Sequence, residues 1–128
     1  MVIDSSAVIA IIIGEPGYQE LEVAINGDTL RLISAASVLE CEIVCSRREL
    51  PWPGRTVDRQ LTRLGIYTVE VSLPQLAAAR EAFRRFGKGN HPAGLNFGDF
   101  FSYALAKVSG EPLLFKGDDF SRTDITPA

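Results

Sequence analysis

The chain has 128 residues, of which 46% are hydrophobic and 23% charged, and its formal net charge is −3. This composition is typical of one globular domain with a sizeable core and excludes an intrinsically disordered chain. The acidic balance gives no support of its own to a nucleic-acid partner, although a local basic patch could still bind one. The apolar run at residues 2–13 contains Asp4 and is too short to span a bilayer, so a soluble cytoplasmic protein is expected.

Short apolar runs alternate with helical patterns along the chain, which predicts an α/β protein. Strands are expected at residues 1–3, 29–33, 66–71 and 112–115, with a short edge strand at 123–125. Helices are expected at residues 7–13, 18–25, 34 or 37 to about 49, 74–86 and 96–110. We therefore predict a single domain over residues 1–128, in which helices cover both faces of a mainly parallel sheet of four to five strands.

Two smaller features complete this outline. The segment Pro51-Trp52-Pro53-Gly54 is a break but not a domain linker, because helical apolar spacing resumes directly after it. Trp52 is expected either on a partner surface or as a cover on the core. Cys41 and Cys45 lie one helical turn apart without a second pair of ligands, which favours buried free thiols over a zinc site.

The predicted helix after residue 95 begins with a clear capping signal. Asn96 is the expected N-cap, and Asp99 lies three positions further on, in the first turn. The apolar residues at helical spacing that should face the core are Phe97, Phe101, Leu105 and Val108. The helix dipole alone could explain an acidic residue at Asp99, but three further acidic residues also lie beside apolar runs.

These acidic residues are placed where a parallel sheet collects its ligands. Asp4 follows the first strand, Glu40 lies in the helix after the second, and Asp118 follows the last strand. Carboxylates that gather at one edge repel each other, so proton sharing or a cation must offset the repulsion. Oxygen ligands without a paired histidine or cysteine favour Mg²⁺ or Mn²⁺, which could activate water and stabilise charge on a phosphodiester oxygen.

Each acidic residue also has a purely structural interpretation. Asp4 could simply cap the first helix, and Glu40 could lie at a helix rim. Asp118 and Asp119 in a Gly-Asp-Asp turn could serve only the turn. The hypothesis of a metal site therefore rests on the joint placement of these residues.

Four blocks of sequence resemble the PIN-domain ribonucleases and, more narrowly, the VapC toxins of bacterial VapBC-type (type II) toxin–antitoxin pairs. They are Met-Val-Ile-Asp-Ser-Ser-Ala at 1–7, Ser-Val-Leu-Glu at 37–40, Asn-Phe-Gly-Asp-Phe-Phe-Ser-Tyr-Ala at 96–104 and Leu-Leu-Phe-Lys-Gly-Asp-Asp-Phe at 113–120. The resemblance covers the whole length in the order of the family. It implies a PIN-like three-layer α/β/α fold and a Mg²⁺- or Mn²⁺-dependent endoribonuclease that a cognate VapB-like antitoxin inhibits. It also implies a homodimer that joins the antitoxin in a larger complex.

The resemblance also implies roles for individual residues. Asp4, Glu40 and Asp99 match the first three acidic positions of the family, with Asp4 and Asp99 as direct metal ligands. Asp118 is the favoured fourth position, with Asp119 in reserve; it and Glu40 would bind through water, hold a second ion or orient the attacking water. Ser6 and Asn96 would hydrogen-bond the carboxylates, although both are equally explicable as helix caps.

Two surfaces are candidates for larger partners. Arg84, Arg85 and Lys88, with His91, precede the Asp99 helix and could contact RNA phosphates, or they could form a solvated helix end. Apolar residues of the first two helices exceed what one helix face must bury, so some could take an antitoxin helix, although most should pack in the core. These residues are Ile9, Ile12, Ile13, Leu21 and Ile25.

Two other classes of function compete with the ribonuclease. A non-catalytic PIN-like module that binds a protein partner would have no use for buried like charges. A receiver domain with a phosphoacceptor aspartate is disfavoured, because Asp58 follows no predicted strand and leaves Lys116 without an acceptor to serve. The metal-dependent endoribonuclease is the leading hypothesis.

Overall fold

The computed structural model describes residues 1–47 and 56–128. The expectations for Pro51–Gly54, including Trp52, and for the end of the third helix lie outside the described residues. Over the rest of the chain, the elements in order are β1 (Val2–Ile3), α1 (Ser5–Ile13), α2 (Tyr18–Gly27), β2 (Leu32–Ser34), α3 (Ala35–Cys45), α4 (Val57–Leu64), β3 (Tyr67–Val69), α5 (Leu73–Phe86), α6 (Asp99–Ser109) and β4 (Leu113–Leu114).

The described strands form one parallel sheet in the order β3-β2-β1-β4. This confirms the predicted α/β class and the parallel sheet. The edge strand expected at 123–125 is wrong, because the segment that pairs with β4 lies slightly later, as an isolated bridge between Leu113 and Pro127. The Thr123 hydroxyl donates to the carbonyl of Phe120 and accepts from the N–H of Ile125, so this part of the chain is a turn.

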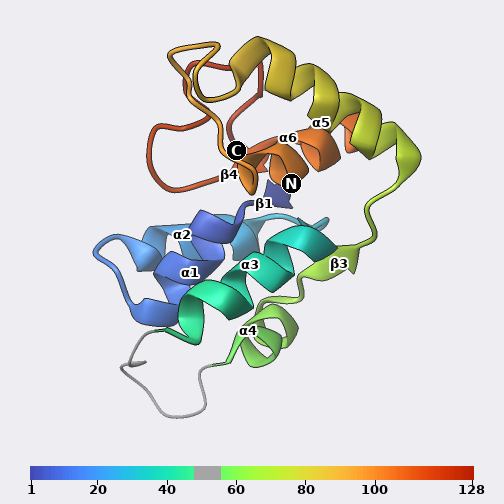
Figure 1. Ribbon diagram of the computed structural model, residues 1–128. Helices are drawn as coiled ribbons and strands as arrows, with labels where there is room; N and C mark the ends of the chain where they lie inside the picture. Colours follow the sequence, from blue (N-terminus) through green and yellow to red (C-terminus); the bar gives the residue numbers. More distant parts are fainter. Residues whose placement is uncertain (48–55) are drawn as a thin grey trace.

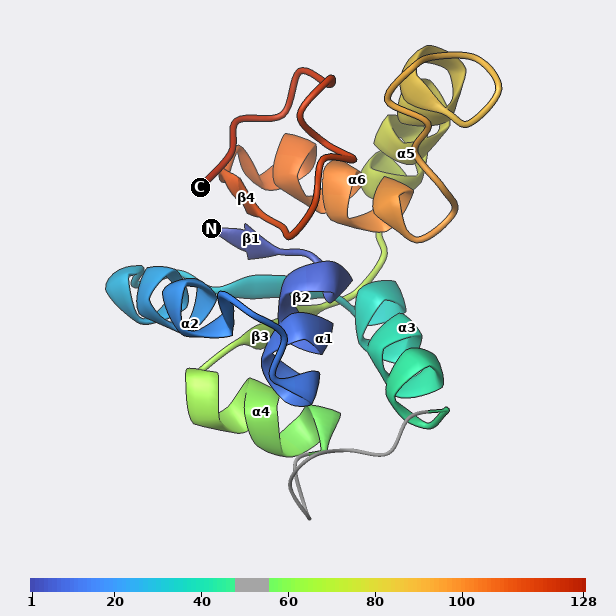
Figure 2. The ribbon, with the colours of Figure 1, turned by 90° about the vertical axis from the view of Figure 1, so that its left-hand side faces the viewer.

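Two apolar clusters cover the two faces of the sheet. Along β1, Val2 belongs to one cluster and Ile3 to the other, as the alternation of side chains along a strand requires. Ile3 packs with side chains from α1 to α4, and Val2 packs with side chains from α5 and α6. Figures 1 and 2 show α1 to α4 on one side of the molecule, with α5 and α6 together on the other.

Apolar residues of α1 and α2 pack in the cluster that contains Ile3. Ile12 and Ile25 are fully buried, and Ile9, Ile13 and Leu21 are partly buried against the same cluster. Core packing therefore accounts for Ile12 and Ile25 in full and for Ile9, Ile13 and Leu21 in part. Cys41 and Cys45 are buried, and neither forms a disulfide within the part of the chain that the structure describes, in agreement with the prediction.

The inward face of α6 differs from the predicted one. Phe97, which precedes the helix, is 78% exposed, and Val108 near its end is also exposed. Leu105 is buried as predicted, and the other buried residues of α6 are Asp99, Ser102, Tyr103, Ala104 and Ala106. Because α6 packs against both the sheet and α5, its buried face is wider than the apolar stripe and includes polar side chains.

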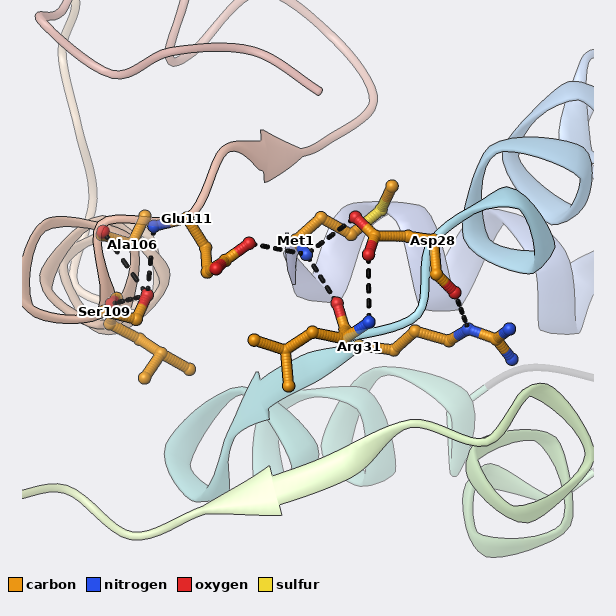
Figure 3. Close-up of polar contacts among 8 residues, drawn as sticks. Met1, Asp28, Arg31, Ala106, Ser109 and Glu111 are labelled. Atoms are coloured by element: carbon orange, nitrogen blue, oxygen red, sulfur yellow. Dashed lines mark hydrogen bonds and ion pairs between the residues drawn. The ribbon is translucent and has the colours of Figure 1, made fainter.

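The amino group of Met1 ties together the beginnings of β1, β2 and β4 (Figure 3). It donates to Asp28 Oδ2 at 2.9 Å, to Glu111 Oε2 at 3.1 Å and to the carbonyl oxygen of Leu30. The hydrogen bond from this amino group is the main cause that holds the pKa of the Asp28 carboxyl below its usual value. In the described part of the chain, no helix combines the length and apolar character that crossing a membrane requires.

Candidate active site

Three of the predicted acidic residues come together near the carboxyl end of the sheet. Asp4 directly follows β1 and caps α1, Glu40 lies in the second turn of α3, and Asp99 is the first residue of α6. Burial is the largest cause that raises the pKa of Asp99 to about 7, and the hydrogen bond from the backbone N–H of Asn96 opposes it. The charges of Asp4, Asp119 and Glu40 add to the rise, which places all three within electrostatic reach of Asp99.

The two carboxylate oxygens of Asp4 have different surroundings. The residue is only 2% exposed, and its Oδ2 atom accepts a hydrogen bond of 2.9 Å from the backbone N–H of Ser6. This is the helix cap that the structural interpretation predicts. Its Oδ1 atom is buried and has no hydrogen-bond partner among the described residues. A buried, unpaired carboxylate oxygen is costly, so capping alone does not explain Asp4.

Asp99 takes part in a reciprocal cap at the start of α6. Its Oδ2 atom accepts a hydrogen bond of 2.7 Å from the backbone N–H of Asn96. The Asn96 side-chain oxygen accepts in turn from the N–H groups of Gly98, at 2.8 Å, and Asp99, at 3.2 Å. The predicted capping signal is therefore present, and it fixes the Asp99 carboxylate in a site where it is 8% exposed.

Glu40 is held by residues that are distant in sequence. Its Oε2 atom accepts a hydrogen bond of 2.7 Å from the hydroxyl of Ser5. On another side its carboxylate lies against the bare α-carbon of Gly98, where an added β-carbon would come within 2.4 Å of Oε1. Neither Ser5 nor Gly98 was predicted as a site residue. No local signal could have identified them, because each contact depends on the tertiary fold.

The turn after β4 supplies one further acidic residue. Asp118 and Asp119 are both exposed, and the carbonyl oxygen of Asp118 accepts from the N–H of Ser121 at 3.1 Å and from its hydroxyl at 2.6 Å. Asp119 is the residue of this pair whose charge contributes to the raised pKa of Asp99. Asp118 and Asp119 both stay candidates for the fourth acidic position, and the charge effect on Asp99 is the one observation that points to Asp119.

Ser6 and Asn96, the two residues predicted to hydrogen-bond the carboxylates, contact them through their backbone N–H groups. Ser6 contacts Asp4 through its backbone N–H, while its hydroxyl accepts a hydrogen bond of 3.0 Å from the N–H of Lys116 just after β4. The Ser6 hydroxyl thus ties the start of α1 to the end of β4. Asn96 contacts the Asp99 carboxylate through its own backbone N–H.

The donor set fits a hard cation that retains water. Within residues 1–47 and 56–128, no three acidic, histidine or cysteine side chains lie close enough together to hold an ion alone. Mg²⁺ does not require such a group, since it usually binds one or two carboxylates and keeps several water molecules. The unpaired Oδ1 atom of Asp4 and the negative charges around Asp99 are features that a cation would compensate.

Two of the three basic residues proposed for RNA contacts are paired with carboxylates of this chain. Arg84 forms an ion pair with Glu81, and Arg85 forms one with Asp124 at 3.0 Å. No side-chain ion pair of Lys88 is seen among the residues that the structure describes. Figures 1 and 2 both place the end of α5 and the loop that follows it above the start of α6.

An apolar groove of about 450 Å³ opens beside Glu40, between α3 and the start of α6. Leu39 is 61% exposed on its α3 side, and Phe97 stands on the other side, with its ring 5.0 Å from that of Phe101. The groove was not predicted, because Phe97 and Phe101 were expected to face the core. Its remaining lining residues are Ala36, Ile43, Val44, Asn96 and Gly98.

This fold and this acidic site define a class of protein. The sequence model of the PIN domain matches residues 1–125, and the chain belongs to the PIN domain family. The chain is 53% identical to "Ribonuclease VapC" of Mycolicibacterium smegmatis over 98% of its own length and 97% of that protein. It is 50% identical to "Ribonuclease VapC30" of Mycobacterium tuberculosis over 98% of its own length and 95% of that protein.

Two solved structures share the fold at low sequence identity. The toxin VapC20 of Mycobacterium tuberculosis, described as cleaving the sarcin-ricin loop, superposes with a TM-score of 0.75 at 17% identity, over 99% of this chain and 97% of that one. A toxin–antitoxin complex from Klebsiella pneumoniae superposes with a TM-score of 0.70 at 15% identity, over the same shares of the two chains. The predicted PIN-like α/β/α fold is therefore confirmed.

Proposed function

We propose that this chain is the toxin of a type II toxin–antitoxin pair and that it cleaves RNA as a metal-dependent endoribonuclease. Relatives that are named VapC ribonucleases align with nearly its whole length at about half identity. The observation that carries the proposal is the buried Asp4 carboxylate, with one unpaired oxygen, within electrostatic reach of Asp99. We take residues 1–128 as a single PIN domain, because both apolar clusters pack on one sheet.

Asp4 and Asp99 are the proposed direct ligands of Mg²⁺ or Mn²⁺, and Glu40 and Asp119 complete the acidic site, with Asp118 as the alternative to Asp119. The ion would supply positive charge that stabilises a phosphodiester oxygen and lowers the pKa of water. Asp4 is suited to a ligand role by its unpaired Oδ1 atom. The Asn96 and Ser6 backbone N–H groups hold one oxygen each of Asp99 and Asp4, so both carboxylates are already oriented.

RNA phosphates need cationic contacts outside the acidic site. We propose Lys88 as the strongest of the three predicted basic residues, because Arg84 and Arg85 already pair with carboxylates of this chain. To reach Lys88, a bound RNA would have to extend from the start of α6 to the loop after α5. Lys88→Ala should then reduce the salt dependence of RNA binding by about one phosphate contact, and Lys107→Ala is a control of the same residue type.

A cognate VapB-like antitoxin would have to cover the acidic site to neutralise the toxin. The groove between α3 and the start of α6 is the proposed place, because an apolar segment in it would contact Leu39 and Phe97 and cover Glu40 at the same time. Leu39→Asp should weaken neutralisation by the antitoxin and leave RNA cleavage intact. Val23→Asp, on the exposed part of α2, is the matched control.

Assembly and location complete the proposal. Leu76 and Phe83 are exposed on α5 and form, with Phe100, a second apolar surface on which another copy of the chain could pack. We propose that a homodimer formed in this way joins the antitoxin in a hetero-oligomer, and that both act in the cytoplasm, where RNA is available. Light scattering of the purified toxin, alone and with Leu76→Asp, tests the dimer.

The central experiment compares RNA cleavage by the wild type and the Asp4→Asn and Asp99→Asn variants, with Mn²⁺, with Mg²⁺ and with chelator. Mutation of a residue that supports a metal ligand typically reduces activity by roughly 10–100-fold. We expect both variants, and the wild type with chelator, to lose more cleavage activity than that. Asp58→Asn, an exposed residue on α4, is the control and should cleave like the wild type. Equal cleavage by wild type and Asp99→Asn would overturn the catalytic assignment of Asp99, and a wild type that does not cleave RNA would support the alternative, a non-catalytic binding module.

A further inference from the structure

The Glu40 carboxylate is enclosed by a hydroxyl on one side and a glycine on another. Ser5, the first residue of α1, donates its hydroxyl hydrogen to Oε2 at 2.7 Å. At Gly98, a β-carbon would come within 2.4 Å of Oε1 and 2.5 Å of Oε2. Such separations are too short for any non-bonded contact, so the carboxylate occupies the space that a side chain at position 98 would need.

The backbone itself does not require a glycine at position 98. Its φ of −64° and ψ of −42° are ordinary helical values that every L-residue adopts. A glycine at such a position loses conformational entropy on folding and offers no packing in return. The feature that explains Gly98 is therefore its contact with Glu40.

Gly98 cannot easily retreat from the carboxylate. Its N–H is held by the Asn96 side-chain oxygen at 2.8 Å, and the next N–H, that of Asp99, is held by the same oxygen. Glu40, by contrast, is the far end of a flexible side chain. A methyl group at position 98 would therefore move the carboxylate and leave the start of α6 in place.

We propose that Gly98 and Ser5 are positioning residues that set the place of the Glu40 carboxylate in the metal site. The inference rests on the proposed metal-dependent function and adds to it two residues that bind no metal themselves. It also links three elements, because Ser5 follows Asp4 and Gly98 precedes Asp99, so the turns that carry the two aspartates also position Glu40.

The test measures Mn²⁺ binding by calorimetry, RNA cleavage and thermal unfolding for Gly98→Ala and Ser5→Ala. Gly27→Ala is the matched control for Gly98→Ala, since a β-carbon at Gly27 would meet nothing within 4 Å. We expect Gly98→Ala and Ser5→Ala each to weaken Mn²⁺ binding and cleavage by roughly 10–100-fold. Gly27→Ala should change both by less than about twofold, and Gly98→Ala should unfold at a temperature no lower than the wild type.

A double-mutant cycle separates positioning from general damage. Glu40→Asp shortens the side chain by one methylene and withdraws the carboxylate from position 98. In that background, Gly98→Ala should cost much less Mn²⁺ affinity than it does in the wild type. Full additivity of the two changes would overturn the inference, as would a Gly98→Ala variant that binds Mn²⁺ like Gly27→Ala or no longer folds. Failure of the wild type to bind Mn²⁺ would overturn the proposed function itself and this inference with it.

Discussion

Asn96 and Asp99 hold each other at the start of α6. The Asp99 carboxylate accepts a hydrogen bond of 2.7 Å from the N–H of Asn96, and the Asn96 side chain accepts one of 3.2 Å from the N–H of Asp99. The cap of the helix and the orientation of a proposed metal ligand are therefore one and the same arrangement. Stability and activity should respond together when it is changed.

Replacement of Asn96 tests this coupling. Asn96→Ala removes the cap acceptor and should lower the free energy of unfolding by about 1 kcal/mol. It should also reduce RNA cleavage, because the Asp99 carboxylate loses its fixed position. Asn96→Ser keeps a cap acceptor and should recover most of both losses in chemical denaturation and cleavage assays. A variant that loses stability but cleaves normally would show that the cap and the site are independent.

Replacement of Asp99 should stabilise the metal-free protein. Burial and neighbouring charges raise the pKa of Asp99 to about 7. At about pH 8 its carboxylate is nevertheless ionised, and this buried charge opposes folding. Asp99→Asn keeps the shape and an oxygen acceptor, and it should raise the free energy of unfolding by about 1 kcal/mol, which is a rise of roughly 3 °C in the midpoint of thermal unfolding. Added Mn²⁺ should stabilise the wild type and have little effect on the variant. A destabilised variant in chelator would contradict this account.

Phe97 and Leu105 offer a contrast between the exposed and buried sides of α6. Because Phe97 is 78% exposed, Phe97→Ala should change the free energy of unfolding by no more than about 0.5 kcal/mol. Leu105 is buried, and Leu105→Ala should cost about 2–5 kcal/mol. Chemical denaturation of both variants measures the difference. Similar losses for the two would mean that Phe97 packs in the core, as the helical spacing alone predicted.

The Tyr103 hydroxyl should control the acid titration of Asp124, to which it donates a hydrogen bond of 2.7 Å. Burial tends to raise the pKa of Asp124, but this hydrogen bond and the contacts with Arg85 and Lys107 outweigh it and lower the pKa below the usual value. A lowered carboxyl pKa gives stability that is present above the unfolded value of about 3.9 and is lost as the pH falls through the folded value.

Tyr103→Phe removes the hydroxyl and keeps the ring. The pKa of Asp124, followed by NMR of its carboxyl carbon, should move up toward the usual value. Unfolding measured between about pH 2 and 6 should then show a smaller loss of stability on the acid side in the variant than in the wild type. An unchanged Asp124 titration would show that Arg85 and Lys107 alone determine its pKa.

The sequence allowed the order of elements to be predicted because local signals agree with the fold. Ser72 and Thr56 cap α5 and α4, and Gly14, Gly65 and Gly110 end helices in the left-handed conformation that favours glycine. The elements that follow parallel strands begin at one edge of the sheet, which is why the sequence could predict that the charges of Asp4 and Glu40 lie within reach of Asp99.

The features of the fold and of the site that were not predicted depend on contacts between residues that are distant in the chain. The outward position of Phe97 could not be predicted, because its spacing with Phe101 is also what a buried stripe would show. No local signal distinguishes Asp118 from Asp119, because the two residues are adjacent in one turn. Ser5 and Gly98 were missed because their common partner, Glu40, lies 35 residues from Ser5 in the chain.

The pairing of the first strand with the last constrains when the site can form during synthesis. β1 gains its neighbour β4 only when Leu113 and Leu114 are available, and Asp119 follows still later. Contacts of such long sequence separation form late, because most of the chain must be ordered before they can close. The strand that carries Asp4 therefore stays without its β4 neighbour until residues 113–114 have been made, and the acidic site can assemble only after that point.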